Sequence, residues 1–295
     1  ILRTIFSTAR LGQAFATDGI RKLASELLED LLRNPLHVLL VSRTFDTTDY
    51  TFRHSISVAT LSIVLAHPLG HDKAQTREIA LAALLHDIGK AKIPDSILNK
   101  PSPLDDREWE RVREHPIEGY RILREQPDLP PLAALVALQH HERLDGSGYP
   151  GGLRAPDIVT AAQIVAVADV YDALTSDRPY RCRFPPPDAL RLVLRQAGAK
   201  LHPQACACLV HRVGVFPPGT WLRLGTGEFA VVKALRTDAP SRPIVQIVLD
   251  RHGRPFHRPH LLNLLHHPSL AVADVLTPHE VAAIKLLYAR PPAGR

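Results

Sequence analysis

The feature of this sequence that most constrains its fold is a succession of apolar segments with helical spacing across residues 46–212. Apolar residues recur there every three to four positions, which is typical of helices that bury one face or most of their surface. We therefore predict five core helices, the third of them broken near Pro116. Their segments read FRHSISVATLSIVLAHPLG, TREIALAALLHDIGK, DDREWERVREHPIEGYRILRE, PPLAALVALQHHE and TAAQIVAVADVYDALTSD.

The regions on either side of this stretch differ from it. Residues 1–45 also have helical spacing and are predicted to form an N-terminal helical segment or linker, interrupted at Pro35. In residues 213–295, apolar runs alternate with glycine turns, in TWLRLGTGEFAVVKAL and again in RPIVQIVLDRHGRPFHR, which is typical of strands. We therefore predict a mainly α protein, with a helical bundle domain over residues 46–212 and a small β-rich C-terminal appendage that ends in a helix.

Each predicted core helix carries a histidine or aspartate where an apolar residue would be expected. A single histidine at the end of an apolar helix is more often a hydrogen-bonded boundary residue than a metal ligand. Asp169, inside QIVAVADVYDAL, is harder to explain in that way, because a buried carboxylate is costly unless a cation compensates it. The whole set is His54, His86, Asp87, His115, His140, His141 and Asp169.

Seven nitrogen and oxygen donors delivered by several helices into one bundle match the way in which helical bundles build dinuclear metal sites. No cysteine belongs to the set, so the donors favour iron, manganese or another borderline metal over a structural zinc. We therefore expect two divalent metal ions, iron or manganese, in the core of the bundle.

Three longer motifs in the same region carry a family resemblance. They are HDIGK at residues 86–90, HHERLDGSGYP at 140–150 and VADVYDALTSDRPYR at 167–181. Together they resemble the HD-GYP branch of the HD phosphohydrolase superfamily, and the resemblance runs from Tyr50 to past Arg212. It implies an HD-type helical bundle and a bacterial enzyme that hydrolyses the second messenger cyclic di-GMP.

The resemblance assigns roles to individual residues. The seven donors would be the metal ligands, with Asp87 as a carboxylate that bridges two metals. Asp87 and Lys90 would be catalytic, with Lys90 also near the scissile phosphate. The other substrate-contacting positions would be Tyr149, Asp172, Arg178 and Arg181, where arginine suits phosphate because its planar fork binds two oxygens at once.

Two details of these assignments remain alternatives or departures. Asp172 lies three residues after Asp169 and so shares its helix face, where it could instead orient a ligand histidine or a metal-bound water. The resemblance implies that family members with a third metal have a glutamate one helical turn before the first histidine. This position is Tyr50 here. Asp49 points about 100° away on a helix and is a poor substitute, so two metals are expected.

The expected chemistry is phosphodiester hydrolysis. Two neighbouring cations lower the pKa of a bridging water to give hydroxide and neutralise charge on the phosphoryl oxygens. The expected product is linear pGpG, with further cleavage to GMP left open. The competing interpretations are a catalytically silent receptor for cyclic dinucleotides, an HD phosphohydrolase of another nucleotide or of a mixed cyclic dinucleotide, and a nucleic-acid-binding module.

Composition bears on partners and location. The net charge of +6 favours an anionic ligand, but the arginines are spread along the chain, so no nucleic acid polymer is expected. Three cysteines and the absence of a membrane-spanning apolar run favour a cytoplasmic location. The chain begins at Ile1 and contains no methionine, so we expect a longer parent protein. The resemblance adds diguanylate cyclase (GGDEF) domains as partners of the loop Gly148, Tyr149 and Pro150, and leaves open a homodimer.

Overall fold

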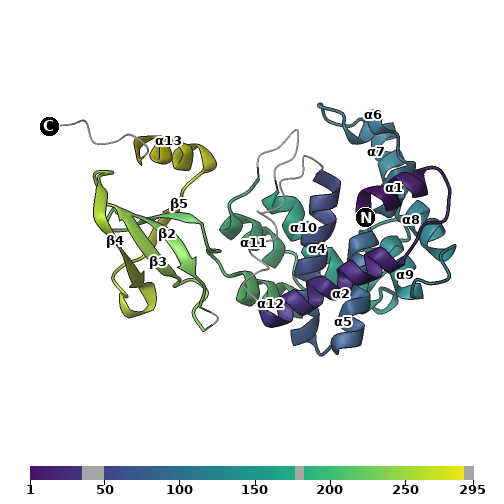
Figure 1. The fold of residues 1–295 in the computed structure, drawn as a ribbon, viewed down its shortest axis with the longest axis horizontal. Helices are drawn as coiled ribbons and strands as arrows, with labels where there is room; N and C mark the ends of the chain where they lie inside the picture. Colours follow the sequence, from purple (N-terminus) through teal and green to yellow (C-terminus); the bar gives the residue numbers. More distant parts are fainter. Residues whose placement is uncertain (35–49, 177–182, 237, 289–295) are drawn as a thin grey trace. The chain divides into compact units, whose positions relative to one another are not determined.

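The computed structural model describes residues 1–34, 50–176, 183–236 and 238–288 of the 295-residue chain. The chain divides into two compact units, which are described separately: Ile1–Phe184 with Ala189–Leu209, and Pro185–Asp188 with Val210–Arg295. Helices build the first unit, and a five-stranded antiparallel sheet dominates the second (Figure 1). The predicted fold class, mainly α with a small C-terminal β appendage, is confirmed.

The helical unit contains long helices joined by short turns and 3-10 segments. Its helices are α1 (Leu2–Arg10), α2 (Asp18–Arg33), α4 (Tyr50–Ala66), α5 (Lys73–Leu85), α6 (Asp95–Leu98), α7 (Asp106–Val112), α8 (His115–Arg124), α9 (Pro131–Gln139) and α10 (Thr160–Thr175). Helices α11 (Pro186–Leu194) and α12 (Pro203–Val213) contribute residues to both units. The 3-10 segments are η2 (His67–Leu69), η3 (Ile88–Lys92) and η4 (Ala155–Asp157).

Helix α5 lies at the centre of this unit. All residues from Ile79 to Leu85 are buried, and the helix packs against α2, α4 and α9. It begins with a capping box in which the Asp72 carboxylate accepts from the Gln75 amide and the Gln75 side chain accepts from the Asp72 amide. Helix α10 packs on α4 and α9, so the segments that carry the predicted ligands surround one core.

The predicted break in the third core segment is confirmed. The segment splits into α7 and α8 at Arg113 and Glu114, and Pro116 lies in the first turn of α8, where its missing N–H costs no hydrogen bond. Helix α7 begins with a second capping box, between Asp105 and Glu108. The break matters because it makes His115 the first residue of a helix instead of an interior one.

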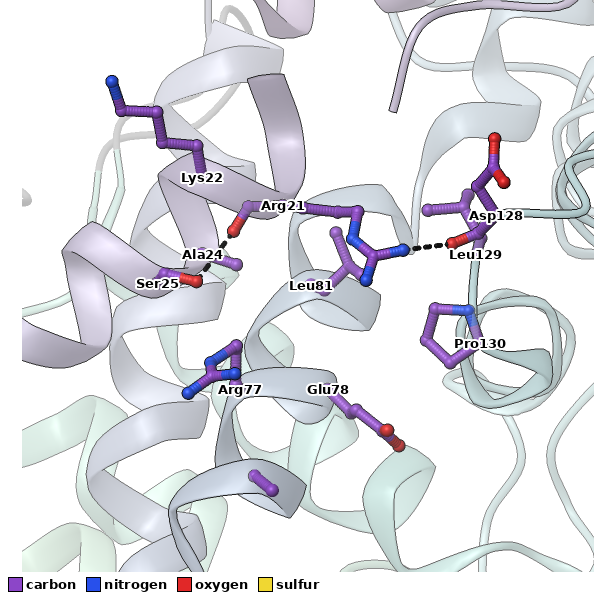
Figure 2. A pocket seen from close by; sticks show the side chains of 11 residues that line it. Arg21, Lys22, Ala24, Ser25, Arg77, Glu78, Leu81, Asp128, Leu129 and Pro130 are labelled. Atoms are coloured by element: carbon purple, nitrogen blue, oxygen red, sulfur yellow. Dashed lines mark hydrogen bonds between the residues drawn. The ribbon is translucent and has the colours of Figure 1, made fainter. Parts of the chain in front are cut away.

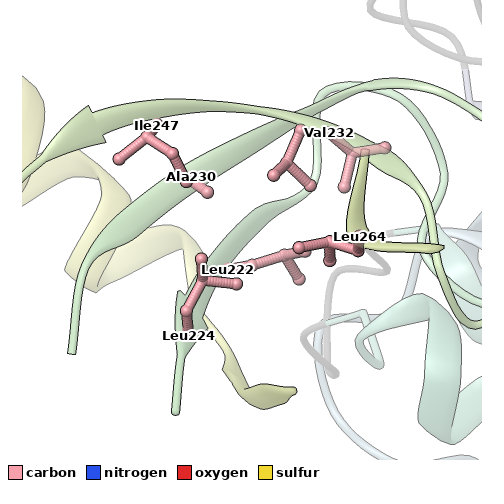
Figure 3. Close-up of a cluster of buried hydrophobic side chains, with 7 residues drawn as sticks. Leu222, Leu224, Ala230, Val232, Ile247 and Leu264 are labelled. Carbon is pink, nitrogen blue, oxygen red and sulfur yellow. The ribbon is translucent and has the colours of Figure 1, made fainter. Parts of the chain in front are cut away.

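The second unit is an antiparallel sheet with the strand order β4-β3-β2-β1-β5. Its strands are β1 (Trp221–Leu224), β2 (Phe229–Ala234), β3 (Ile244–Leu249), β4 (Pro255–Asn263) and β5 (Val272–Val275). The 3-10 segment η5 (Leu264–His266) lies between β4 and β5, and α13 (Pro278–Tyr288) follows β5. Figure 3 shows the apolar core of this unit, formed by Leu222, Leu224, Ala230, Val232, Val245, Ile247 and Leu264.

Both predicted hairpins and the terminal helix are present, whereas β5 was not predicted. Strand β5 pairs with β1, and its burial pattern has no fully buried residue, which explains its weak sequence signal. Within the described residues, no helix is long and apolar enough to cross a lipid bilayer. Five histidines of the second unit are exposed: His252, His257, His260, His266 and His267.

Candidate metal centre

The structure brings all seven predicted donors together inside the helical unit. Six of the seven residues are buried, and the side chain of His141 is 19% exposed. They come from α4 (His54), the end of α5 (His86 and Asp87), the start of α8 (His115), the end of α9 (His140 and His141) and the middle of α10 (Asp169).

A glycine sets the distance between the end of α5 and the start of α8. A Cβ atom added to Gly89 would lie 1.9 Å from the carbonyl oxygen of His115 and 2.5 Å from the amide nitrogen of Gly119. Only glycine therefore allows η3 to pack this closely against the first turns of α8. The close packing brings the carboxylate of Asp87 within reach of the His115 ring.

Asp87 lies at the centre of the cluster, with different histidines beside each of its oxygens. Its Oδ2 atom is 3.3 Å from Nε2 of His86 and 3.6 Å from Nε2 of His54. Its Oδ1 atom is 3.3 Å from Nε2 of His115 and 3.8 Å from Nε2 of His140. Two donor groups, each compact enough for one metal ion, consequently share Asp87: His54, His86 and Asp87 form one, and Asp87, His115, His140 and His141 form the other.

Asp169 connects these two groups. Its Oδ1 atom lies 3.2 Å from Nε2 of His54, and its Oδ2 atom lies 3.9 Å from Nδ1 of His141. Asp169 thus faces one histidine of each group across the cluster from Asp87. Two carboxylates that each contact both groups provide the negative charge that a pair of divalent cations requires.

The backbone fixes which nitrogen of each buried ring is free. Nδ1 lies 2.7 Å from the Ala83 carbonyl oxygen in His86, 2.7 Å from that of Val112 in His115, and 2.9 Å from that of Ala137 in His140. A carbonyl only accepts, so Nδ1 carries the proton and Nε2 presents a lone pair to the cluster. Metal-binding histidines are commonly oriented in this way.

His54 is oriented by a carboxylate instead. Its Nδ1 atom lies 2.7 Å from Oδ2 of Asp172, which is itself buried. Burial alone would lower the pKa of His54, but its hydrogen bonds with Asp169 and Asp172 raise it to about 9. The two carboxylates therefore stabilise positive charge on this ring, and a metal ion bound at Nε2 would take the place of the proton there.

Asp87 is held in its charged form. Burial alone would raise its pKa, but the Lys90 ammonium and the neighbouring His86 and His115 hold the pKa well below the usual range. Nζ of Lys90 lies 2.5 Å from Oδ2 of Asp87, and the lysine side chain is 26% exposed. Lys90 thus lies at the rim of the cluster, where its partly exposed side chain pairs with a buried carboxylate.

His115, His140 and His141 are held neutral. Burial lowers the pKa of His115 to about 4, and burial also holds the pKa values of His140 and His141 well below the usual range. Neutral imidazole is the form that binds metals. These rings are therefore ready to bind a cation near neutral pH without first losing a proton.

The donor set fits divalent cations by a further observation. Among the described residues, Nε2 of His86 and Oδ1 of Asp87 are buried polar atoms with no hydrogen-bond partner. Buried polar atoms are paired in the great majority of cases, so an unpaired nitrogen beside an unpaired carboxylate oxygen needs an explanation. A cation held by the group of His54, His86 and Asp87 would satisfy the nitrogen, and one held by the group of Asp87, His115, His140 and His141 would satisfy the oxygen.

The glycine-rich turn at residues 145–152 covers one side of the cluster. The Tyr149 ring stacks on His141, with ring centroids 4.7 Å apart and an interplanar angle of 26°. The Tyr149 amide donates to the His141 carbonyl at 3.2 Å, and a Cβ atom on Gly148 would lie 2.4 Å from Cα of Glu142. The turn therefore folds back directly onto the two histidines that precede it.

Glu142 is a functional residue that the sequence reasoning missed. Its buried carboxylate accepts from the amides of Gly151 at 2.6 Å and Leu153 at 2.9 Å, and so fixes the far side of the turn. The available signal was its position: an acidic residue directly between a histidine pair and a glycine-rich turn can reach the free amides of that turn.

Some predicted positions lie outside the described residues. Arg178, Arg181 and Asp49 belong to this group, and for Tyr50 only the backbone, at the start of α4, is described. The predicted phosphate contacts of the two arginines and the predicted absence of a third metal therefore stay predictions.

A surface hollow elsewhere in the helical unit contains none of the predicted residues. It has a volume of about 520 Å³ and lies between α2, α5 and residues 128–130 (Figure 2). Arg21 crosses it and donates to the carbonyl oxygen of Asp128 at 2.5 Å. Its lining mixes basic and acidic side chains, and the metal centre lies apart from it.

Comparison with known proteins identifies two matching family models. One is described as an HD domain and matches residues 28–204, and the other is described as a KOW domain associated with HD domains and matches residues 222–284. Together they account for the helical bundle and the antiparallel sheet as separate pieces of the chain.

Curated relatives are similar over long stretches. A cyclic di-GMP phosphodiesterase of Pseudomonas aeruginosa is 40% identical over 256 residues, which are 87% of this chain and 58% of the relative. A cyclic di-GMP phosphodiesterase of Thermotoga maritima is 40% identical over 63% of this chain and 51% of the relative. A 3'3'-cGAMP-specific phosphodiesterase of Vibrio cholerae is 36% identical over 57% of this chain and 36% of the relative.

The chain spans about half the length of the curated relatives that it matches first, so those proteins contain segments without a counterpart here. The family match itself covers more than half of this chain and includes every predicted metal ligand. The chain belongs to the HD domain family, and its resemblance to the HD-GYP branch is confirmed.

Proposed function

We propose that this protein is a metal-dependent phosphodiesterase that hydrolyses cyclic di-GMP to linear pGpG. The observation that carries the proposal is the position of Asp87, whose two oxygens face two separate sets of histidine nitrogens in a buried site. The printed names of the two relatives that are each 40% identical support the choice of substrate. Further cleavage of pGpG to GMP remains open.

The seven clustered side chains would hold two divalent ions, with iron or manganese favoured by the imidazole and carboxylate donors. Such ions supply Lewis-acid activation of water and neutralise phosphoryl charge. Asp87, held ionised by its surroundings, would bridge the ions. His86, His115 and His140 would direct their Nε2 lone pairs inward, because backbone carbonyls hold their Nδ1 protons.

Lys90 would bind the reacting phosphate. Its ammonium is paired with Asp87, and its side chain is partly exposed at the rim, so Lys90 would contact a phosphoryl oxygen while the ion pair is kept. Arg178 and Arg181 are proposed as additional phosphate contacts on the strength of the family resemblance alone.

Tyr149 and Asp172 would serve the site in different ways. Tyr149, stacked on His141, would form one wall of the substrate site. Asp172 is only 3% exposed and lies behind His54, which favours the orienting role over a direct contact with substrate. A carboxylate on the far nitrogen of a ligand histidine fixes the ring and raises its basicity.

A mixed cyclic dinucleotide is the second candidate substrate. The relative from Vibrio cholerae is named for 3'3'-cGAMP, and it is 36% identical over more than half of this chain. The ligand set alone does not discriminate between the two dinucleotides, because the ions that it would hold contact phosphate and not bases.

The wider organisation is proposed as predicted. Residues 46–212 would form the catalytic domain, residues 1–45 an N-terminal helical segment or linker, and residues 213–295 a small β-rich appendage with a terminal helix. The loop of Gly148, Tyr149 and Pro150 would present a surface to diguanylate cyclase (GGDEF) domains.

The direct test is to load the protein with Mn²⁺ or Fe²⁺ and incubate it separately with cyclic di-GMP and 3'3'-cGAMP. Chromatography of the products should show linear pGpG from cyclic di-GMP. His86→Ala should lose turnover but still bind the dinucleotide. Metal-loaded wild-type protein that binds cyclic di-GMP without cleaving it would instead support a receptor.

A further inference from the structure

Arg113 lies beside the proposed substrate site but outside the set of metal-binding residues. It is the residue that ends α7, two positions before His115. The central carbon of its guanidinium lies 5.3 Å from the centroid of the Tyr149 ring, and Tyr149 in turn stacks on His141. A cation–π contact at this distance restrains a long side chain that would otherwise move freely.

The charge of Arg113 is available for a ligand. Arg113 is exposed, and among the described residues no carboxylate oxygen lies within 4 Å of its guanidinium. The neighbouring Arg111 is different, because it forms an ion pair with Glu114 and donates to the Lys92 carbonyl. Arg113 therefore combines a restrained guanidinium with an exposed position and no carboxylate partner among the described residues.

The other arginine near Tyr149 is already engaged. Arg143 donates to the carbonyl oxygens of His140 at 3.2 Å and Glu142 at 2.8 Å, which ties it to the backbone before the glycine-rich turn. Its contribution is thus to hold this backbone in place. Of these two arginines, Arg113 is the one whose guanidinium makes no hydrogen bond to the described residues, whereas one nitrogen of the Arg143 guanidinium is already bound.

A cyclic dinucleotide presents a specific demand for such a cation. Its ring contains two phosphodiester groups, each with one negative charge, and the metal centre reacts with one of them. The other keeps its charge and needs a partner beyond the metal ligands. A guanidinium meets this demand well, because its planar fork donates to two phosphate oxygens together.

We propose that Arg113 binds the second, non-reacting phosphodiester of the cyclic dinucleotide, with Tyr149 as the platform that holds its guanidinium. This inference rests on the proposed function, because it takes a cyclic dinucleotide as substrate. Arg113 is a substrate-binding residue in this account and takes no part in bond cleavage.

The test compares two substrates in Arg113→Gln. Cyclic di-GMP has two phosphodiesters, whereas bis(p-nitrophenyl) phosphate has one and cannot use a second phosphate site. The ratio of kcat/KM for cyclic di-GMP to kcat/KM for the model substrate should fall at least about tenfold, mainly through KM. Metal content should equal that of the wild type, and Arg113→Lys should restore part of the ratio.

The matched control is Arg121→Gln. Arg121 is exposed on α8 and paired with Glu118 at 2.7 Å, away from Tyr149, so the ratio should stay at the wild-type value. An equal loss on both substrates would overturn the proposal, because Arg113 would then act through Tyr149 or the metals. An unchanged ratio would also overturn it, as would a loss for cyclic di-GMP with none for cyclic di-AMP, which would indicate a contact with guanine.

Failure of the proposed function is distinguishable from failure of this inference. If the wild type does not cleave cyclic di-GMP, the proposed function fails, and calorimetric titration of the metal-loaded protein then decides the inference. A dissociation constant for cyclic di-GMP that rises at least about tenfold in Arg113→Gln supports the phosphate contact. Equal dissociation constants, or no binding by the wild type, overturn it.

Discussion

Nδ1 of His54 lies 2.7 Å from Oδ2 of Asp172, while Nε2 of the same ring lies 3.2 Å from Oδ1 of Asp169. The imidazole is thus held between two aspartates that are three residues apart on α10. Asp172 fixes the ring from behind, and the free edge of the ring points to the cluster. The face of one helix thereby determines the direction of a side chain on another helix, α4.

Replacement of Asp172 by asparagine should weaken metal binding without removing a proposed ligand. The amide keeps the shape of the carboxylate but not its charge, so the hold on His54 is reduced. We expect the dissociation constant for Mn²⁺ to rise about 10- to 100-fold, as measured by competition with a chelator. Asp157→Asn, at an exposed carboxylate on η4, should leave the constant unchanged. Equal affinities in all three proteins would contradict the orienting role.

Metal binding should stabilise the fold through Asp87. For one site, metal at about 100 times its dissociation constant adds about 2.7 kcal/mol to the free energy of unfolding. Asp87→Asn should lose most of this gain, because both donor groups share this carboxylate. Thermal unfolding with Mn²⁺ and with EDTA measures the difference. Asp128→Asn, at an exposed side chain, serves as the control. An undiminished metal-dependent rise in Tm for Asp87→Asn would exclude Asp87 as the shared ligand.

Two glycine-to-alanine substitutions should differ in their effect on the free energy of unfolding. Gly89→Ala places a methyl group 1.9 Å from the His115 carbonyl oxygen, so α8 must shift away from Asp87. We expect a loss of about 1–3 kcal/mol or more in stability, together with weaker metal binding. Gly19 lies in α2, and the methyl group added in Gly19→Ala would lie 3.5 Å from the Ile1 side chain, which is an ordinary contact distance. This substitution should therefore be neutral or stabilising. Chemical denaturation checks both, and a silent Gly89→Ala would contradict the close packing.

The Glu142 carboxylate should control the order of the glycine-rich turn. Glu142→Gln replaces a charged acceptor of two amide hydrogen bonds with a neutral one, which weakens the hold on Gly151 and Leu153. Hydrogen exchange at these two amides should become about 10-fold faster or more. Glu125→Gln, at an exposed position after α8, should not change it. Unchanged exchange in Glu142→Gln would mean that other contacts hold the turn.

Much of the fold could be predicted because its signals are local. The apolar spacing around Ile79 and Leu85 gives a buried helix in any context, and Pro116 marks the start of α8 by its own geometry. The glycine turns of the two hairpins are equally local. Strand β5 escaped prediction because it is short, has no fully buried residue and lies at the edge of the sheet, where it pairs with β1.

The candidate site divides in the same way. The histidines and aspartates could be found as polar residues in apolar helices and as parts of recognisable motifs. The roles of Gly89 and Arg113 depend on contacts with segments far from them in the sequence, namely the His115 carbonyl and the Tyr149 ring. Spacing along the sequence does not encode such distances, so these residues emerge only from the packed structure.

The most direct test of the central claim is to titrate the metal-free protein with Mn²⁺ and to measure bound metal and cyclic di-GMP hydrolysis in the same samples. The account predicts that turnover to pGpG rises with metal occupancy and reaches its plateau at two bound ions per chain. Asp87→Asn should reach neither two bound ions nor the wild-type turnover. A wild-type protein that holds two ions, binds cyclic di-GMP and leaves it intact would contradict the account.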